Sequence, residues 1–288
     1  MATEPTSAMS FLDMRDESFL ARLAEKAKFK PRSHATYYSA HLPELNHRLS
    51  LGLGLDLPEP ITDVQDIGVD TSTPTLSNMS KMEVVYLGNS MLERLKTTGK
   101  DTRLATLQSS WNAGCGGDTT ENILYRLSEG MYDILKTPHP NKHIKIWLLV
   151  SGTNNLRPKK PFRERDVESW RLLVEACFKM APTSKVLAVG MFYRKDVLDE
   201  VVEQSNDMLR QVVEQVNEGL VKNGWGERVQ WVKATDGRVT MDMLDDHVHL
   251  NEEGYQIFDE ALFPLIQKAL GEPEQSKEEM RGEETAMS

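Results

Sequence analysis

The chain has 288 residues and a net charge of −10, with 39% hydrophobic and 27% charged residues. This composition fits a globular protein with one large domain, and no apolar run is long enough to cross a bilayer. The acidic balance excludes a general electrostatic attraction to nucleic acid or anionic lipid, so we expect no nucleic-acid partner and a small or neutral ligand.

Residues 1–80 and 271–288 differ in composition from the middle of the chain. The spacing of apolar residues predicts a helix over 18–29, and the Gly, Pro, Ser and Thr of residues 51–80 predict an irregular linker. The polar, acidic residues 271–288 predict a disordered tail. We therefore expect three parts: a partly helical N-terminal extension (1–80), one folded domain (81–270) and the tail (271–288).

The first residues and the cysteines of the chain indicate where the protein resides. The first residues carry neither the basic region nor the apolar region of a secretory signal. Two cysteines, Cys115 and Cys177, are too few for a disulfide framework in a chain of this length and suit a reducing compartment. We expect an intracellular, cytoplasmic protein.

Short apolar runs rich in β-branched residues recur through the predicted domain. They predict buried strands at 83–87, 144–150, 185–191 and 228–232, and a weaker strand leads into Trp111 and Asn112. Helical patterns alternate with these runs, most clearly over 196–222, where apolar residues form a single stripe. This alternation predicts an α/β fold with a parallel sheet covered by helices on both sides, and chemistry at the carboxyl ends of the strands.

Small and polar residues follow each predicted strand end. These segments are Gly88-Asn89-Ser90, residues 114–118, residues 152–155 and, before the last helix, residues 245–251. All four fall on one edge of the predicted sheet. Residues gathered at that edge supply every group that hydrolytic acyl transfer requires: a nucleophile, a base, a group that orients the base, and oxyanion donors.

Each of these roles has a candidate residue. Ser90 begins a helix, where its own N–H is unpaired and the helix dipole favours developing negative charge. Gly117 has no side chain, so its N–H can approach a substrate closely, and Asn154 offers an amide donor on the neighbouring loop. His249 can accept the Ser90 proton, and Asp246, three residues earlier, can hold the other nitrogen of His249.

The order Gly-x-Ser, glycine turn, Gly-x-Asn and Asp-x-x-His resembles that of the SGNH (GDSL) hydrolases. The blocks NAGCGGDTTENILYRL, GTNN and DDHVHL are similar to the catalytic subunits of intracellular platelet-activating factor acetylhydrolase type Ib. The resemblance covers residues 83–270 and places Ser90, Gly117, Asn154 and His249 at the four naming positions. It implies that 81–270 is a hydrolase domain with a flavodoxin-like three-layer α/β/α fold and a parallel sheet of about five strands.

The resemblance also implies an activity and partners. The expected reaction is hydrolysis of a short-chain, acetyl-type ester of a lipid or a sugar, without a metal or other cofactor. Met91 and Val248, which flank the nucleophile and the base, would border the acyl pocket. A homodimer and a WD-repeat partner are implied by the family alone.

Asn89 departs from the family, which usually has Asp at this position. The resemblance implies that this side chain hydrogen-bonds around the oxyanion loop, where Asn keeps the shape and loses the charge. The alternative function is therefore a weakly active or inactive scaffold or binding protein that keeps the fold.

Simpler interpretations of the same residues remain open. Ser90 alone fits a helix N-cap, Asp118 or Thr119 can cap the next helix with Arg126, and Cys115 fits small-residue packing. His247 and His249 suggest a metal site, but no third ligand with a recognisable spacing is present in the sequence. We therefore expect no metal.

Overall fold

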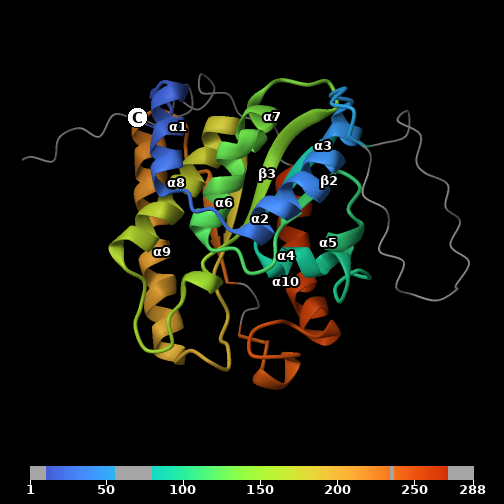
Figure 1. Ribbon diagram of the computed structural model, residues 1–288. Coiled ribbons are helices and arrows are strands. Elements are labelled where there is room, and N and C mark those ends of the chain that lie inside the picture. The colour runs from blue at the N-terminus through green and yellow to red at the C-terminus, as the bar shows by residue number, and fades with distance from the viewer. Residues whose placement is uncertain (1–10, 56–79, 234–236, 272–288) are drawn as a thin grey trace, which may run out of the picture.

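The computed structural model describes residues 11–55, 80–233 and 237–271, which contain a central sheet of five parallel strands (Figure 1). The strands are β1 (Met82–Gly88), β2 (Ser110–Gly114), β3 (Lys142–Val150), β4 (Lys185–Val189) and β5 (Val229–Val232). Their order in the sheet is β2-β1-β3-β4-β5. This is the flavodoxin-like order, and it confirms the predicted fold class.

Side chains of successive strand residues enter two different hydrophobic layers. In β1, Val85 and Leu87 pack into the larger cluster, whereas Val84 and Tyr86 pack into the smaller one. All four are at most 1% exposed. A strand buried on both faces needs apolar residues at every position, which explains why β1 and β3 are continuous apolar runs.

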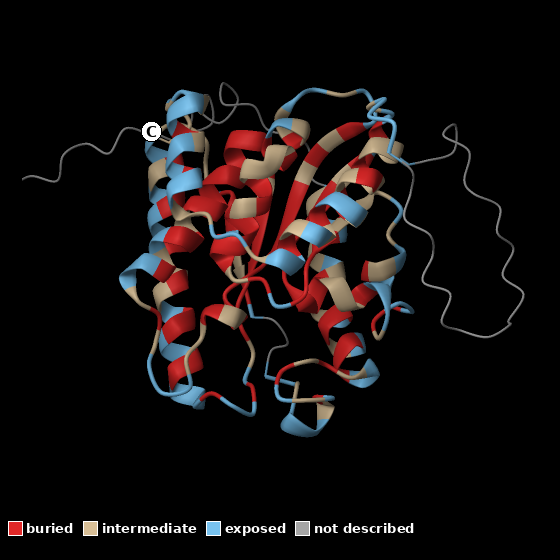
Figure 2. Ribbon diagram, in the orientation of Figure 1, coloured by how far each residue is buried: buried red, intermediate tan, exposed pale blue. Residues whose placement is uncertain are grey.

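Helices cover both faces of the sheet, and their inner sides are buried (Figure 2). Apolar residues of α6 (Thr120–Arg126), α7 (Tyr132–Lys136), α8 (Glu164–Met180) and α9 (Asp199–Lys222) belong to the larger cluster. Those of α4 (Ser90–Glu93), α5 (Arg103–Thr106) and α10 (Glu252–Gly271) belong to the smaller one. The fold therefore has three layers.

Two predicted helices occur with shifted ends. The helix predicted over 196–222 is α9, which begins at Asp199 because Leu198 is extended. The helix predicted over 18–29 is α1 (Asp16–Lys26), and extended backbone at Ala27 ends it. The strand predicted over 185–191 ends at Val189.

The described part of the N-terminal residues is helical and contributes to the core. It forms α1, α2 (Pro31–Thr36), a π-helical turn (Tyr37–His41) and α3 (Leu42–Leu49). Phe19, Leu23, Tyr37 and Leu45 are at most 1% exposed and join the same cluster as the strands. The predicted linker falls mostly on residues 56–79 and the predicted tail on 272–288, which lie outside the described residues.

No helix within the described residues is both long enough and apolar enough to span a membrane.

Candidate active site

The turn after β1 presents Ser90 at the first position of α4. A side chain at Gly88 would collide with the Val150 carbonyl of β3, so only glycine allows the two strands to approach here. Asn89 is the N-cap, and its Oδ1 accepts a hydrogen bond from the Met91 N–H at 3.0 Å. Ser90 itself is 7% exposed. The small residues after the strand thus both permit the tight turn and fix the serine.

Ser90, His249 and Asp246 form a continuous chain of hydrogen bonds. His249 Nε2 lies 2.9 Å from Ser90 Oγ, and His249 Nδ1 lies 2.6 Å from Asp246 Oδ2. The sequence separation of Ser90 and His249 is 159 residues, so the fold itself brings them together. The arrangement matches the geometry by which a histidine activates a serine.

Asp246 is held in its ionised form. Burial alone would raise its pKa, but hydrogen bonds from the His249 ring and from the backbone N–H groups of His249 and Val248 outweigh burial. The net effect holds the pKa of Asp246 well below its ordinary value. The backbone bonds, at 2.8 Å and 2.9 Å, also fix the carboxylate in the orientation that accepts from His249 Nδ1.

Three candidate oxyanion donors lie on adjacent strand-end segments. Within the described residues, neither the Ser90 N–H nor the Gly117 N–H has an acceptor. Gly117 has a φ of 72°, a conformation that glycine adopts without strain. The Asn154 amide donates one hydrogen bond to the Asp118 carbonyl at 2.9 Å, which orients the amide. Its second N–H has no acceptor among the described residues and can donate to a substrate.

Within the part of the chain that the structure describes, the Asn89 side chain does not make the hydrogen bond around the oxyanion loop that the family resemblance implies. The side chain is fully buried, and its bond to Met91 lies within its own turn rather than across to the oxyanion loop. Asn89 Nδ2 has no hydrogen-bond partner among the described residues. Among the described residues, the Asn89 side chain makes one hydrogen bond, and it does so through an acceptor oxygen that an aspartate would also supply.

A buried ion pair supports the strand ends beneath these donors. Arg126 Nε lies 2.9 Å from Asp118 Oδ2, and both side chains are fully buried. The same guanidinium donates to the carbonyls of Gly88 (3.1 Å) and Ala113 (2.9 Å), at the ends of β1 and β2. Asp118 is thus the partner of Arg126, whereas Thr119 caps α6 with Asn122, whose Oδ1 accepts from the Thr119 N–H at 3.0 Å.

The N-terminal helices reach the same loop, which the sequence did not predict. Lys30 Nζ lies 2.5 Å from the Gly117 carbonyl oxygen and 3.4 Å from that of Gly116. Ser33 Oγ donates to Asp118 Oδ1 at 2.5 Å. These pairs are more than 80 residues apart in sequence, and no motif marks Lys30 or Ser33.

His41 also contacts these strand ends, and the sequence did not predict this contact. Burial first, and then the Arg126 charge, hold the pKa of His41 well below its ordinary value, so the ring is neutral. Its Nε2 then donates to the Gly114 carbonyl at 3.1 Å, and its Nδ1 accepts from Arg126 at 3.3 Å.

The remaining predicted residues lie near this edge without joining the hydrogen-bond chain. Met91 and Val248 are 1% and 4% exposed and belong to one hydrophobic cluster. Burial raises the pKa of Cys115 to about 11, so the thiol stays protonated, as expected for a packing role. The His247 side chain is 53% exposed, and the described residues contain no cluster of three or more potential metal ligands.

Comparison with known proteins decides the family. The model of the GDSL-like lipase/acylhydrolase family matches residues 87–257, more than half of the chain. The chain belongs to this family. Ser90, Gly117, Asn154 and His249 all fall within the match, whereas Lys30 precedes it. As a member of the GDSL-like lipase/acylhydrolase family, the protein is a carboxylic ester hydrolase.

Relatives of this GDSL-like protein include subunits of platelet-activating factor acetylhydrolase IB. It is 26% identical to the alpha1 subunit from Rattus norvegicus, over 75% of this chain and 90% of the relative. It is 24% identical to the alpha2 subunit from Homo sapiens, over 68% and 81%. A family 3 carbohydrate esterase from Clostridium thermocellum is a structural neighbour, with 18% identity, a TM-score of 0.47 and coverage of 66% and 99%.

Proposed function

We propose that the protein is a serine esterase that uses Ser90, His249 and Asp246 as a catalytic triad. Ser90 Oγ attacks the ester carbonyl while His249 Nε2 accepts its proton, and Asp246 stabilises the resulting imidazolium. His249 then protonates the departing alcohol, which leaves an acyl group on Ser90. Water activated by His249 releases the acid and restores the serine. The hydrogen-bond chain of 2.9 Å and 2.6 Å is the observation that carries this proposal.

The oxyanion hole in this proposal consists of the Ser90 N–H, the Gly117 N–H and the Asn154 amide. The two backbone N–H groups lack acceptors among the described residues. The Asn154 amide uses one N–H for its hydrogen bond to the Asp118 carbonyl, so its other N–H can donate to the oxyanion. Donors that are fixed before the reaction stabilise the tetrahedral oxyanion without the cost of reorganisation.

The proposed substrate is a short-chain, acetyl-type ester of a lipid or sugar. Two relatives are named as acetylhydrolase subunits, and Met91 and Val248, which flank Ser90 and His249 in the sequence, are large or branched side chains held in the core. Hydrolysis of p-nitrophenyl acetate, butyrate and octanoate tests both claims. We expect the highest kcat/KM for p-nitrophenyl acetate. A kcat/KM that rises with chain length would contradict the preference for short acyl groups, and the absence of hydrolysis of all three esters would contradict the esterase function.

Dimerisation and binding to a WD-repeat partner stay predictions.

Lys30→Met is expected to lower kcat about tenfold with little change in KM. Lys30 donates hydrogen bonds to the carbonyls of Gly116 and Gly117, which lie on either side of the Gly117 N–H, so it orients the peptide whose N–H would bind the oxyanion. A hydrogen bond from a charged group contributes about 1.5–3 kcal/mol, and partial exposure reduces that figure here. The measurement is steady-state kinetics with p-nitrophenyl acetate, with thermal unfolding of the same preparation.

Lys28→Met is the matched control for Lys30→Met. Lys28 lies on the same segment, but its ammonium only approaches Glu121 at 4.0 Å and does not reach the glycine turn. We expect wild-type kcat for Lys28→Met and partial recovery in Lys30→Arg, which restores a cation. Equal losses in Lys28→Met and Lys30→Met would show that the effect is general charge removal.

Asn89→Asp is expected to change kcat/KM by less than about tenfold, or roughly 1.4 kcal/mol. Both side chains can accept from the Met91 N–H, and no proton transfer is assigned to this position. The unpaired, buried Nδ2 of Asn89 is the feature that favours the alternative of an inactive scaffold. If the native protein is inert and Asn89→Asp gains activity by several orders of magnitude, the scaffold function is correct for the natural sequence.

A further inference from the structure

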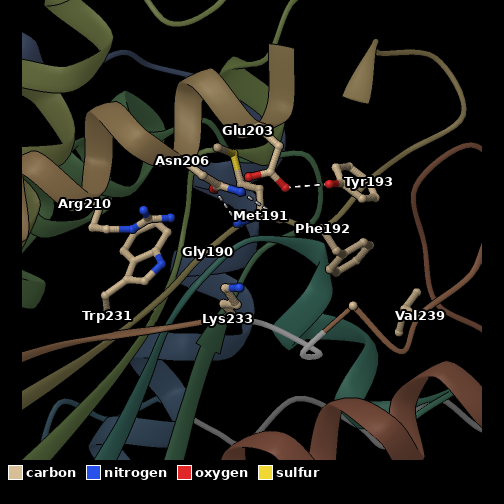
Figure 3. Close-up of a pocket in the computed structure, with 11 residues that line it drawn as sticks. Gly190, Met191, Phe192, Tyr193, Glu203, Asn206, Arg210, Trp231, Lys233 and Val239 are labelled. Carbon is tan, nitrogen blue, oxygen red and sulfur yellow. Dashed lines mark hydrogen bonds between the residues drawn. The ribbon is translucent and has the colours of Figure 1, made fainter. Parts of the chain in front are cut away.

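A pocket of about 240 Å³ opens between α9 and the carboxyl ends of β4 and β5 (Figure 3). No residue of the proposed triad or oxyanion hole lines it. It lies on the same edge of the sheet as Ser90, since both follow the carboxyl ends of parallel strands. This edge is where parallel sheets bind ligands.

The floor of the pocket is held in place by specific contacts. Asn206 of α9 donates to the Met191 carbonyl at 2.8 Å and accepts from the Met191 N–H at 2.9 Å, which fixes the backbone after β4. The Trp231 ring lies directly over Gly190, where a Cβ atom would stand 2.7 Å from the ring. The glycine therefore makes room for an aromatic platform at the strand end.

The charged side chains that line this platform are Arg210, Lys233 and Glu203. The Arg210 guanidinium lies 5.9 Å from the centroid of the Trp231 ring and forms an exposed ion pair with Asp207 of the same helix at 3.2 Å, a weak pair that leaves other N–H groups of the guanidinium for a ligand. Lys233 follows two residues after Trp231. The nearby Glu203 carboxylate already accepts a hydrogen bond from the Tyr193 hydroxyl at 2.6 Å. Figure 3 shows Trp231 and Arg210 on one side of the pocket and Tyr193 on the other. Two cations beside an indole fit a flat ring that carries an anionic group.

The pocket is connected to the candidate active site through two sets of contacts. The Met191 sulfur lies 3.0 Å from the position of a Cβ atom on Gly152, two residues before Asn154. Phe192 packs against the hydrophobic cluster that contains Val248, the neighbour of His249.

The loop that leaves the pocket floor also reaches the turn that carries the triad. Lys195 N–H donates to the His247 carbonyl at 2.8 Å, and Lys195 Nζ donates to the Leu244 carbonyl at 3.0 Å. The loop that follows the pocket floor is thus hydrogen-bonded to the turn that carries Asp246 and His249.

We propose that this pocket binds the alcohol part of the substrate, in the form of a ring that carries a phosphate or carboxylate group. The role of the pocket as a substrate subsite rests on the proposed esterase function, whereas the binding of an anionic ring in the pocket does not depend on that function. The indole of Trp231 contacts the ring face, and Arg210 and Lys233 pair with the anion. The substrate class is then an acyl ester of an anionic, ring-bearing alcohol.

Calorimetric titration of the native protein with phenyl phosphate, benzoate and phenol tests the binding directly. We expect at least one of the two anions to bind at least about tenfold more tightly than phenol, and the double variant Arg210→Met/Lys233→Met to lose that preference. Lys222 is an exposed cation at the end of α9, the helix that also carries Arg210. Lys222→Met is therefore the matched control, and it should bind the anions as the native protein does. Binding of neither anion, or equal anion binding by the double variant, would overturn the proposal. Thermal unfolding verifies that the variants fold.

A kinetic comparison separates the subsite from the esterase function. The substrates are p-nitrophenyl acetate and 4-acetoxyphenyl phosphate, which carries its anion on the alcohol ring. The double variant should lose about tenfold in kcat/KM for the phosphate ester and remain within about twofold for p-nitrophenyl acetate. Equal losses for the two esters would overturn the subsite role. If neither ester reacts, the esterase function fails, and the titration still decides whether the pocket binds the anion.

Discussion

Ser90→Ala is expected to lower kcat for p-nitrophenyl acetate by at least about 10⁴-fold, the largest effect of any single change in this chain. The alanine keeps the turn intact but removes the only hydroxyl within hydrogen-bond distance of His249 Nε2 among the described residues. The measurement combines steady-state hydrolysis with thermal unfolding, which should stay within a few degrees of the native value.

The matched control for this prediction is Ser110→Ala. Ser110 lies at the start of β2, where its hydroxyl donates to the Leu107 carbonyl, and it has no contact with the triad. We expect native kcat for Ser110→Ala. Hydrolysis retained by Ser90→Ala at the native rate would assign the chemistry to another nucleophile.

Arg126→Met is expected to destabilise the fold by about 3–5 kcal/mol, the largest effect on stability. The substitution removes a fully buried guanidinium and leaves the Asp118 carboxylate buried without its counterion. It also removes the donors to the Gly88 and Ala113 carbonyls. Denaturant unfolding in urea, analysed for the midpoint and slope, measures the loss.

A double-mutant cycle with Asp118→Asn separates the ion pair from the other contacts of Arg126. Because the double variant buries no unpaired charge, its loss of stability should be smaller than the sum of the two single losses. Strict additivity would show that the pair contributes no coupling and that the carbonyl contacts account for the loss.

The sheet and the candidate site were predictable because their signals are local. Buried parallel strands such as β3 are continuous apolar runs, and the residues proposed to react follow directly after them. β2 gave the weakest signal, since it is a short edge strand of five residues in which Ser110 and Asn112 are only partly buried. Once the strand order is known, the position of each strand-end segment follows.

The contacts that join the N-terminal helices to the oxyanion loop were not predictable. Lys30 is the last residue of the irregular segment between α1 and α2, Ser33 lies in the short helix α2, and neither belongs to a periodic pattern that points to residues 116–118. Arg126 fits the apolar-polar pattern of an exposed helix residue, whereas its side chain is fully buried by Asp118 and two carbonyls. Contacts of this kind depend on the tertiary arrangement of distant segments, which no single-sequence pattern encodes.

Labelling with a fluorophosphonate tests the central claim most directly, because this reagent reacts with a serine only when a neighbouring base activates it. The native protein should gain one phosphonyl adduct, located on Ser90 by peptide mass spectrometry, and Ser90→Ala should gain none. His249→Gln should react far more slowly, since it lacks the base that lies 2.9 Å from Ser90 Oγ. An unlabelled native protein, or an adduct on a residue other than Ser90, would contradict the proposed triad.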